Sequence, residues 1–164
     1  SKGYEFLKKF IQGVNEGERF QLRKEEVEWD KKEYFPRLLT TKSGWIDWNW
    51  SGEDIEKFCN SFDSPYPGAH TRLNGKKTLT LKNVTLIKTA GYHPYCSGII
   101  INISRNNYIE IATNSGILRV KDWKTIETNS VAPRLGDRLI TPCELLDSAK
   151  YRIRYGDEGP IVND

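Results

Sequence analysis

The 164-residue sequence contains no methionine, only two histidines and only three cysteines, and these shortages argue against several kinds of site. His70 and His93 lie far apart, without a cysteine or carboxylate at ligand spacing, so no metal site is expected. Cys59, Cys96 and Cys143 are widely spaced and form no CxxC pattern. This spacing argues against a disulfide framework and predicts buried free thiols in a cytoplasmic protein.

Long apolar runs and phosphate-binding glycine motifs are also missing. No stretch approaches the roughly 18 apolar residues of a membrane-spanning helix, and the chain does not open with a signal peptide, so no membrane partner is expected. Without GxGxxG, GxxxxGK[ST] or GxSxG, the sequence offers neither a phosphate loop nor a serine nucleophile. His93 and Cys96 are close in sequence but lack an orienting third group, which favours an ordinary loop. We therefore expect no catalytic residue, and the missing initiator predicts a fragment or a processed chain.

The charge balance is only mildly basic. The chain carries 25 Lys and Arg against 22 Asp and Glu, a net charge of +3. Such a balance tolerates an anionic ligand but falls short of the basic stripe that a dedicated nucleic-acid binder presents.

Two helices are indicated before the middle of the chain. Apolar residues at helical spacing predict a helix over residues 4–16, and the charged stretch 18–43 predicts a strand or two followed by a linker. "SGED" has the form of a capping box that starts at Ser51, and the apolar stripe beyond it predicts a helix over 52–62.

In the rest of the chain, apolar and polar residues alternate with a period of two, as in β-strands. Asn74-Gly75 is a hairpin signal between two alternating segments. "TPCELL" has the form of a Thr-x-x-Glu cap and predicts either a short helix over 142–149 or a β-bridge. Four or five short strands with tight turns predict a mainly β fold with flanking helices, either a small antiparallel barrel or a sandwich. The strands begin at residue 69 and continue through 98–104, 108–113 and 117–123.

Three tryptophans, Trp45, Trp48 and Trp50, lie within six positions directly before the second helix. One interpretation is that "WIDWNW" is an extended segment whose aromatic face packs on the helix and barrel. The other is a stacking platform for a base or a sugar. Packing is the interpretation that the pattern favours.

The run "EYFPRLLTTKSGWIDWNWSGEDIEKFCNSFDSPYPGAHTRLNGKKTLTL" resembles the formyltransferase family that uses 10-formyltetrahydrofolate. The family includes methionyl-tRNA formyltransferase and the sugar-nucleotide N-formyltransferases. Its Tyr-x-Pro-Arg-like motif, "IDW" segment and Pro-x-Pro-Gly-Ala turn look like Tyr34 to Arg37, Ile46 to Trp48 and Pro65 to Ala69, in the same order. "SGIIINISRNNYIEIATNSGILRVKDW" and "RLGDRL" resemble the C-terminal barrel of the family, which is of open, OB-like type.

The resemblance implies a C-terminal part without the catalytic machinery. In the family, formyl transfer depends on an Asn, a His and an Asp of an N-terminal domain, and none of those segments is present in this sequence. Residues 1–43 would be the last helix of that domain and a linker, and residues 44–164 the barrel-like domain. The chain would then hold no cofactor, would not catalyse alone, and would have the N-terminal catalytic domain as partner, with 10-formyltetrahydrofolate serving the intact enzyme.

By the same resemblance, four residues are expected to border the acceptor site. They are Tyr34, Arg37, Tyr66 and His70, although Tyr66 could equally pack in its turn and Arg37 could form a surface ion pair. The acceptor suggested by "PYPGA" and by the low charge is a nucleotide-linked amino sugar.

Two alternatives stay open. A tRNA acceptor would require several basic residues to share one barrel face. A stand-alone binding module, including a homodimer formed through edge strands, would need no catalytic domain. The basic residues in question are Lys76, Lys77, Lys82, Lys88, Arg119, Lys121 and Lys124.

Overall fold

The computed structural model describes residues 2–21, 33, 35, 38–105, 108–127, 132–151, 153–156 and 159–161. Contacts divide the chain into two units, residues 1–35 and 36–164. The boundary near residue 43 therefore stays a prediction. Within the described part, no helix combines the length and the apolar character that crossing a membrane would require.

The first unit contains helix α1 (Lys2–Asn15), which confirms the helix predicted from apolar spacing. Its large apolar side chains lie exposed on the helix, and one of them, Phe10, packs against the ring of Phe20 with 4.8 Å between ring centroids. Gly17, which follows the helix, has a φ of 81°, a conformation in which helices commonly end. The exposed apolar residues are Tyr4, Phe6, Leu7, Phe10, Ile11 and Val14.

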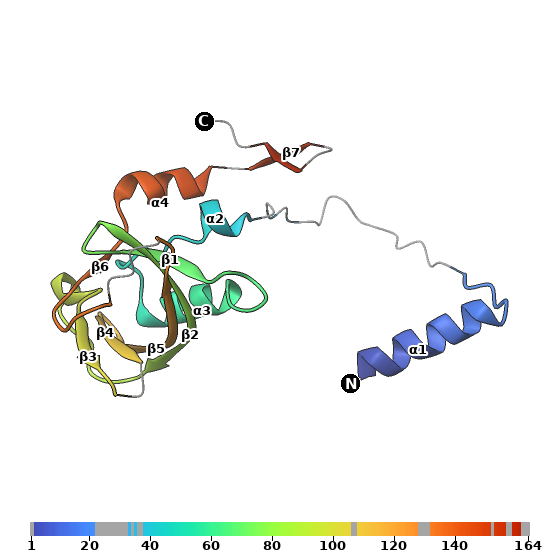
Figure 1. Cartoon of the computed structure of the whole chain (residues 1–164), viewed down its shortest axis with the longest axis horizontal. Helices are drawn as coiled ribbons and strands as arrows, with labels where there is room; N and C mark the ends of the chain where they lie inside the picture. The colour runs from blue at the N-terminus through green and yellow to red at the C-terminus, as the bar shows by residue number, and fades with distance from the viewer. Residues whose placement is uncertain are drawn as a thin grey trace. The chain divides into compact units, whose positions relative to one another are not determined.

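The second unit is an antiparallel sheet curled into the expected open barrel with flanking helices (Figure 1). Its six strands lie in the order β3-β4-β5-β2-β1-β6. Hairpin connections explain most of this order, because β1 and β2 pair, β3 and β4 pair, and β4 and β5 pair. The strands are β1 (Ala69–Leu73), β2 (Lys77–Ile87), β3 (Ile100–Ile103), β4 (Ile109–Thr113), β5 (Gly116–Thr125) and β6 (Leu139–Ile140).

The two edges of the sheet meet beside Gly98. The Leu139 amide donates to the Gly98 carbonyl at 2.7 Å, and the Ile100 amide donates to the Asp137 carbonyl at 2.8 Å. Gly98 has a φ of 82°, and a Cβ at this position would lie 2.1 Å from the Leu139 carbonyl oxygen. A residue without a side chain is therefore required where the barrel closes.

Turn chemistry sets the first hairpin. Asn74 and Gly75 have φ values of 50° and 71°, and the Lys76 amide donates to the Leu73 carbonyl at 3.0 Å. Two central residues with positive φ are the mark of a type I′ turn, as the Asn-Gly pair predicts.

Strand β2 changes its inward side part-way along. Leu79 and Leu81 face the core at odd positions, whereas Val84 does so at an even position. Between them, Asn83 has a φ of 51°. The Asp63 carboxylate accepts the Asn83 amide at 2.8 Å and fixes this conformation. Before Asn83, the odd-numbered residues of β2 face the core. Its even-numbered residues there, including Thr80, face the opposite side of the sheet.

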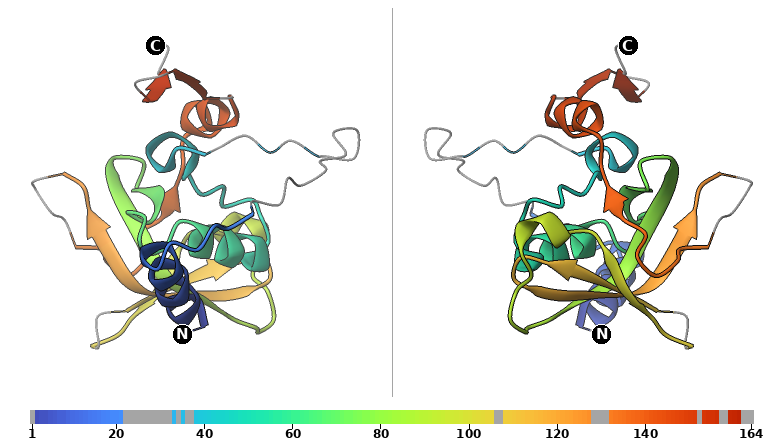
Figure 2. Two further views of the ribbon diagram at one scale, coloured as in Figure 1. Left: turned by 90° about the vertical axis from the view of Figure 1, so that its right-hand side faces the viewer. Right: turned by 90° about the vertical axis from the view of Figure 1, so that its left-hand side faces the viewer.

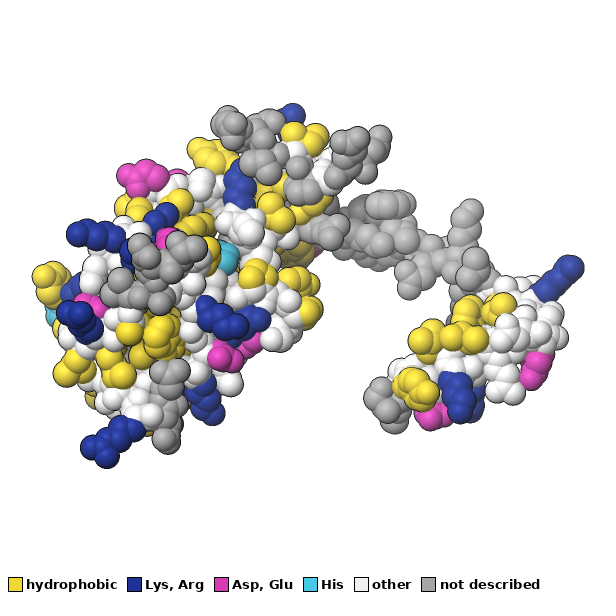
Figure 3. Space-filling view, viewed as in Figure 1, with side chains coloured by type: hydrophobic (Ala, Val, Ile, Leu, Met, Phe, Trp, Pro, Cys, Tyr) yellow, Lys and Arg dark blue, Asp and Glu magenta, His cyan; other side chains and the backbone are white. Residues whose placement is uncertain are grey.

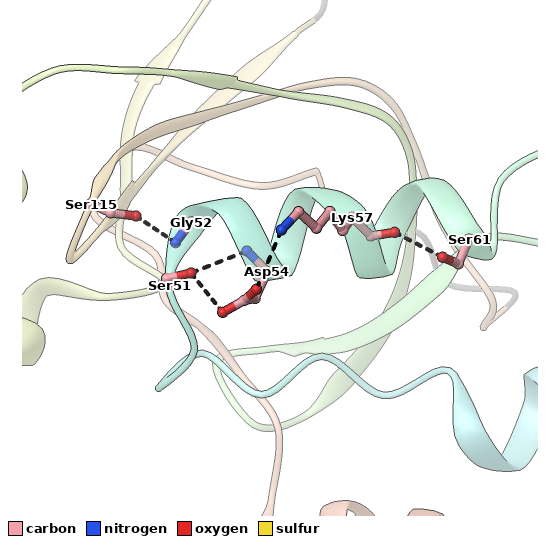
Figure 4. A network of polar contacts seen from close by, with 6 residues as sticks. All are labelled: Ser51, Gly52, Asp54, Lys57, Ser61 and Ser115. Carbon is pink, nitrogen blue, oxygen red and sulfur yellow. Dashed lines mark hydrogen bonds and ion pairs between the residues drawn. The ribbon is translucent and has the colours of Figure 1, made fainter. Parts of the chain in front are cut away.

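Helix α3 (Gly52–Ser61) confirms the predicted helix and its cap (Figure 4). Ser51 accepts the Asp54 amide at 3.1 Å, and the Gly52 amide donates to Ser115 Oγ of the β4–β5 turn at 2.6 Å. Helix α3 lies against β2 and β5, and Figure 2 shows the ribbon from two further sides. Of its predicted apolar stripe, Ile55, Cys59 and Phe62 belong to the buried core.

The tryptophan cluster has different environments at each position. Trp48 is 7% exposed, and its Nε1 donates to Thr71 Oγ1 at 2.9 Å, so this residue packs as expected. Trp50 is 36% exposed and contacts Phe58 edge-on, with ring centroids 5.0 Å apart. Trp45 is half-buried and turns to a different surface, described below.

Several short elements lie beyond the barrel strands and were not predicted. They are α2 (Thr40–Ser43), the 3-10 helix η2 (Pro94–Cys96) and the hairpin of β7 (Arg154–Gly156) and β8 (Gly159–Ile161). Helices α2 and α4 (Cys143–Lys150) pack together, and Figure 1 shows them side by side.

Two details of the sequence analysis are wrong. Helix α4 exists, but Thr141 does not cap it, because Thr141 Oγ1 donates instead to the Ile46 carbonyl at 2.6 Å. The cysteines are free, yet only Cys59 is buried, whereas Cys96 is half-buried and Cys143 is exposed. Burial raises the pKa of the Cys59 thiol to about 12, so this cysteine is unreactive.

Candidate functional site

A groove with a volume of about 790 Å³ lies against strands β1, β2 and β5. Strand alternation creates it, because His70 and Arg72 lie directly opposite Thr80 and Thr78, so that all four side chains share one face. The other lining residues are Thr41, Trp45, Ser64, Pro67, Lys82, Asp122, Trp123, Lys124, Thr125 and Ile126.

The chain segment that enters the barrel supplies one wall of this groove. The His70 amide donates to the Gly44 carbonyl at 2.6 Å, and the Ile46 amide donates to the His70 carbonyl at 2.9 Å. These two bonds hold Trp45 beside His70 as a parallel β-bridge. The rings of Trp45 and His70 are tilted with 5.4 Å between their centroids, which gives the groove an aromatic end.

His70 is 3% exposed and lines the groove from β1. Burial lowers the pKa of its imidazole, although the nearby Thr40 carbonyl acts in the opposite direction without reaching good hydrogen-bond geometry. The ring is therefore neutral at physiological pH. A neutral imidazole presents one donor and one acceptor.

Buried polar atoms without a hydrogen-bond partner concentrate at this groove. In the part of the chain that the structure describes, four such side-chain atoms occur: both ring nitrogens of His70, Nε of Arg72 and Nε1 of Trp123. All three residues line the groove. An unpaired buried polar group costs about 1–3 kcal/mol, and natural proteins contain few of them. Their concentration on one surface makes this groove the candidate ligand site.

The groove is also weakly cationic. Arg72, Lys82 and Lys124 contribute positive charge, and Asp122 lies directly opposite Lys82 across β2 and β5. The Arg72 guanidinium lies over the Trp45 ring, 5.7 Å from its centroid, in a cation–π contact. A surface of this kind suits an anionic ligand that also carries a flat ring.

Of the four residues expected at the acceptor site, the two that the structure describes, His70 and Tyr66, line different hollows. His70 lines the groove, whereas Tyr66 is 52% exposed and lines a separate hollow of about 490 Å³ with Phe62 and Tyr155. Tyr34 and Arg37 lie outside the described residues.

Sequence reasoning missed Arg72 and Trp123. Arg72 could have been found, because it lies two residues after His70 on a predicted strand and must share its face. Trp123 could not, because its position depends on how β5 pairs with β2. Of the seven basic residues considered for tRNA, Lys82 and Lys124 line the groove.

Two other kinds of site considered from the sequence are a His93–Cys96 pair and a metal site. His93 Nδ1 accepts the Tyr95 amide at 3.2 Å within the turn before Cys96, which is the expected loop arrangement. Across the described residues, no group of three or more His, Cys, Asp or Glu side chains could hold a metal ion.

Comparison with known proteins identifies the barrel. Residues 38–134, more than half of the chain, match the family model for the C-terminal domain of formyl transferases. No curated protein matches the sequence significantly.

Proposed function

The chain belongs to the formyl transferase C-terminal domain family, and on this premise we propose that it is the acceptor-binding part of a folate-dependent N-formyltransferase acting on an amino-sugar nucleotide. Family membership implies a catalytic N-terminal domain as partner. That domain would bind 10-formyltetrahydrofolate and supply the catalytic residues, while the barrel would hold part of the acceptor.

The observation that carries this proposal is the groove with its unpartnered donors at His70, Arg72 and Trp123. Small-molecule sites are clefts of roughly 300–1,000 Å³ with a few convergent polar groups, and the groove has this size and composition. A nucleotide-linked sugar is a ligand of the matching kind.

A tRNA acceptor is the second candidate, because family members of both kinds have this domain. In Figure 3 the Lys and Arg side chains over the barrel unit are scattered among hydrophobic ones and form no continuous stripe on the face in view. Of the seven basic residues considered for tRNA, Arg119 is paired with Glu110 at 2.7 Å. Phosphate-backbone binding needs many free cations together, so this face favours the small acceptor.

Isothermal titration distinguishes the two candidates. We would titrate this chain, and a longer chain that also carries the catalytic domain, with nucleotide-linked amino sugars and with tRNA at about 50 and 200 mM salt. The proposal expects binding of an amino-sugar nucleotide by both chains, tighter in the longer one. Binding of tRNA by this chain alone, falling steeply with salt, would reverse the choice of acceptor.

A further inference from the structure

We propose that the groove binds the nucleoside diphosphate part of its ligand, with the base at the Trp45 end and the phosphates at the Lys124 end. This inference rests on the proposed function, because a nucleoside diphosphate is the part that different amino-sugar nucleotides share. It adds which moiety the barrel holds and which residues hold each end.

The register of the sheet places these two ends on one line. Trp45 is bridged to His70, His70 lies opposite Thr80, and Thr80 lies opposite Lys124. These residues belong to four adjacent strands or extended segments, and neighbours lie about 4.8 Å apart, so the line spans roughly 14 Å. One end is aromatic and the other is cationic, which is the order of groups along a nucleoside diphosphate.

The hydrogen-bonding capacity of the groove indicates the same ligand class. Arg72 Nε and Trp123 Nε1 can only donate, and the neutral ring of His70 adds one donor and one acceptor. The unpartnered atoms therefore offer three donors against one acceptor. A ligand that satisfies them must bring mainly acceptors, and phosphate oxygens and base carbonyls are acceptors of this kind.

Among the described residues, Lys124 forms no ion pair, although Asp122 lines the same groove two residues away on the same strand. Asp122 lies opposite Lys82, whereas Lys124 lies opposite the uncharged Thr80. Lys124 is exposed, and the bond that the Thr80 hydroxyl donates at 3.4 Å goes to the Lys124 backbone carbonyl and does not involve the ammonium group. A diphosphate would supply the missing counter-charge.

The test uses isothermal titration of the whole chain with uridine diphosphate, adenosine diphosphate and inorganic pyrophosphate. Both nucleotides should bind about 5- to 150-fold more tightly than pyrophosphate, because a base stacked on an aromatic ring contributes about 1–3 kcal/mol. Lys124→Gln should weaken nucleotide binding about fivefold and reduce its dependence on salt. Lys121→Gln is the matched control, because Lys121 is an exposed lysine of the same strand that does not line the groove.

Two further variants test the aromatic end and the donors. Trp45→Leu should reduce the preference for nucleotides over pyrophosphate, and Trp123→Phe, which keeps a ring but removes the donor, should weaken nucleotide binding about tenfold. Thermal melting identifies any variant that does not fold. Lys124 and Lys121 are surface positions, so their comparison remains decisive in that case.

The outcomes separate this inference from the proposed function. If an amino-sugar nucleotide binds but free nucleoside diphosphates do not, the groove assignment is overturned while the proposed function stands. If nucleoside diphosphates bind but no amino-sugar nucleotide does, the groove assignment holds and the proposed function fails. Equal binding by Lys124→Gln and Lys121→Gln, or pyrophosphate binding as tight as that of the nucleotides, also overturns the inference.

Discussion

Closure of the barrel depends on Gly98, and two glycine-to-alanine substitutions separate the reasons. At Gly98 an alanine meets two penalties: a φ of 82° and a Cβ 2.1 Å from the Leu139 carbonyl oxygen. At Gly136 an alanine meets only the φ penalty, because φ is 85° but no atom lies within 4 Å of the new Cβ. The left-handed conformation costs an alanine about 1–2 kcal/mol, and overpacking costs about 1–3 kcal/mol more.

Gly98→Ala should therefore lower the free energy of unfolding by about 2–5 kcal/mol, and Gly136→Ala by about 1–2 kcal/mol. At roughly 4 °C per kcal/mol, Tm should fall by roughly 8–20 °C in the first variant and by roughly 4–8 °C in the second. Differential scanning calorimetry measures both under identical conditions. Equal losses in the two variants would refute the argument that the carbonyl of Leu139 excludes a side chain at Gly98.

Three further predictions concern the core and the surface. Trp48→Phe should cost about 1–3 kcal/mol in urea unfolding, because the buried Thr71 hydroxyl loses its donor; an unchanged midpoint would contradict this. Asp63 accepts two backbone amides, which lower the pKa of its carboxyl, so its stabilisation is complete above the unfolded pKa of about 3.9 and is lost as pH falls through the lower folded pKa. Asp63→Ala should therefore unfold more easily than the wild type at pH 7 but differ little from it at very low pH, as acid and urea titrations would show. A thiol reagent at pH 8 should modify Cys143 quickly and Cys59 only on unfolding, and rapid labelling that persists in Cys143→Ser would point to a different cysteine.

The sequence predicts those parts of the fold that depend on local chemistry. The cap at Ser51 and the turn at Asn74-Gly75 need only a few neighbouring residues, and both are confirmed. Thr141 fails as a cap because the Ile46 carbonyl, 95 residues away along the chain, competes successfully for its hydroxyl. Local signals cannot reveal such a competitor, because it exists only once the entering segment lies beside the barrel.

The candidate site also combines features that local sequence predicts with features that depend on long-range pairing. A family resemblance predicts His70 at the site, and Arg72 follows from strand alternation, but the groove is also lined by Trp45 and Trp123. Both tryptophans are brought there by pairings that no short window contains: a parallel bridge for Trp45 and the β2–β5 register for Trp123. The sequence therefore predicts a polar strand face and offers the tryptophan segment as a stacking platform only as the less favoured interpretation.

The position of Trp45 links the groove to the chain that leads into the barrel. The two backbone bonds through Gly44 and Ile46 hold this tryptophan beside His70, and Gly44 directly follows α2, whose Thr41 also lines the groove. A ligand that contacts Trp45 would therefore restrain the entering segment, and a displacement of that segment would move one wall of the site. Under the proposed function, acceptor binding would therefore depend on how the segment that leads into the barrel is held.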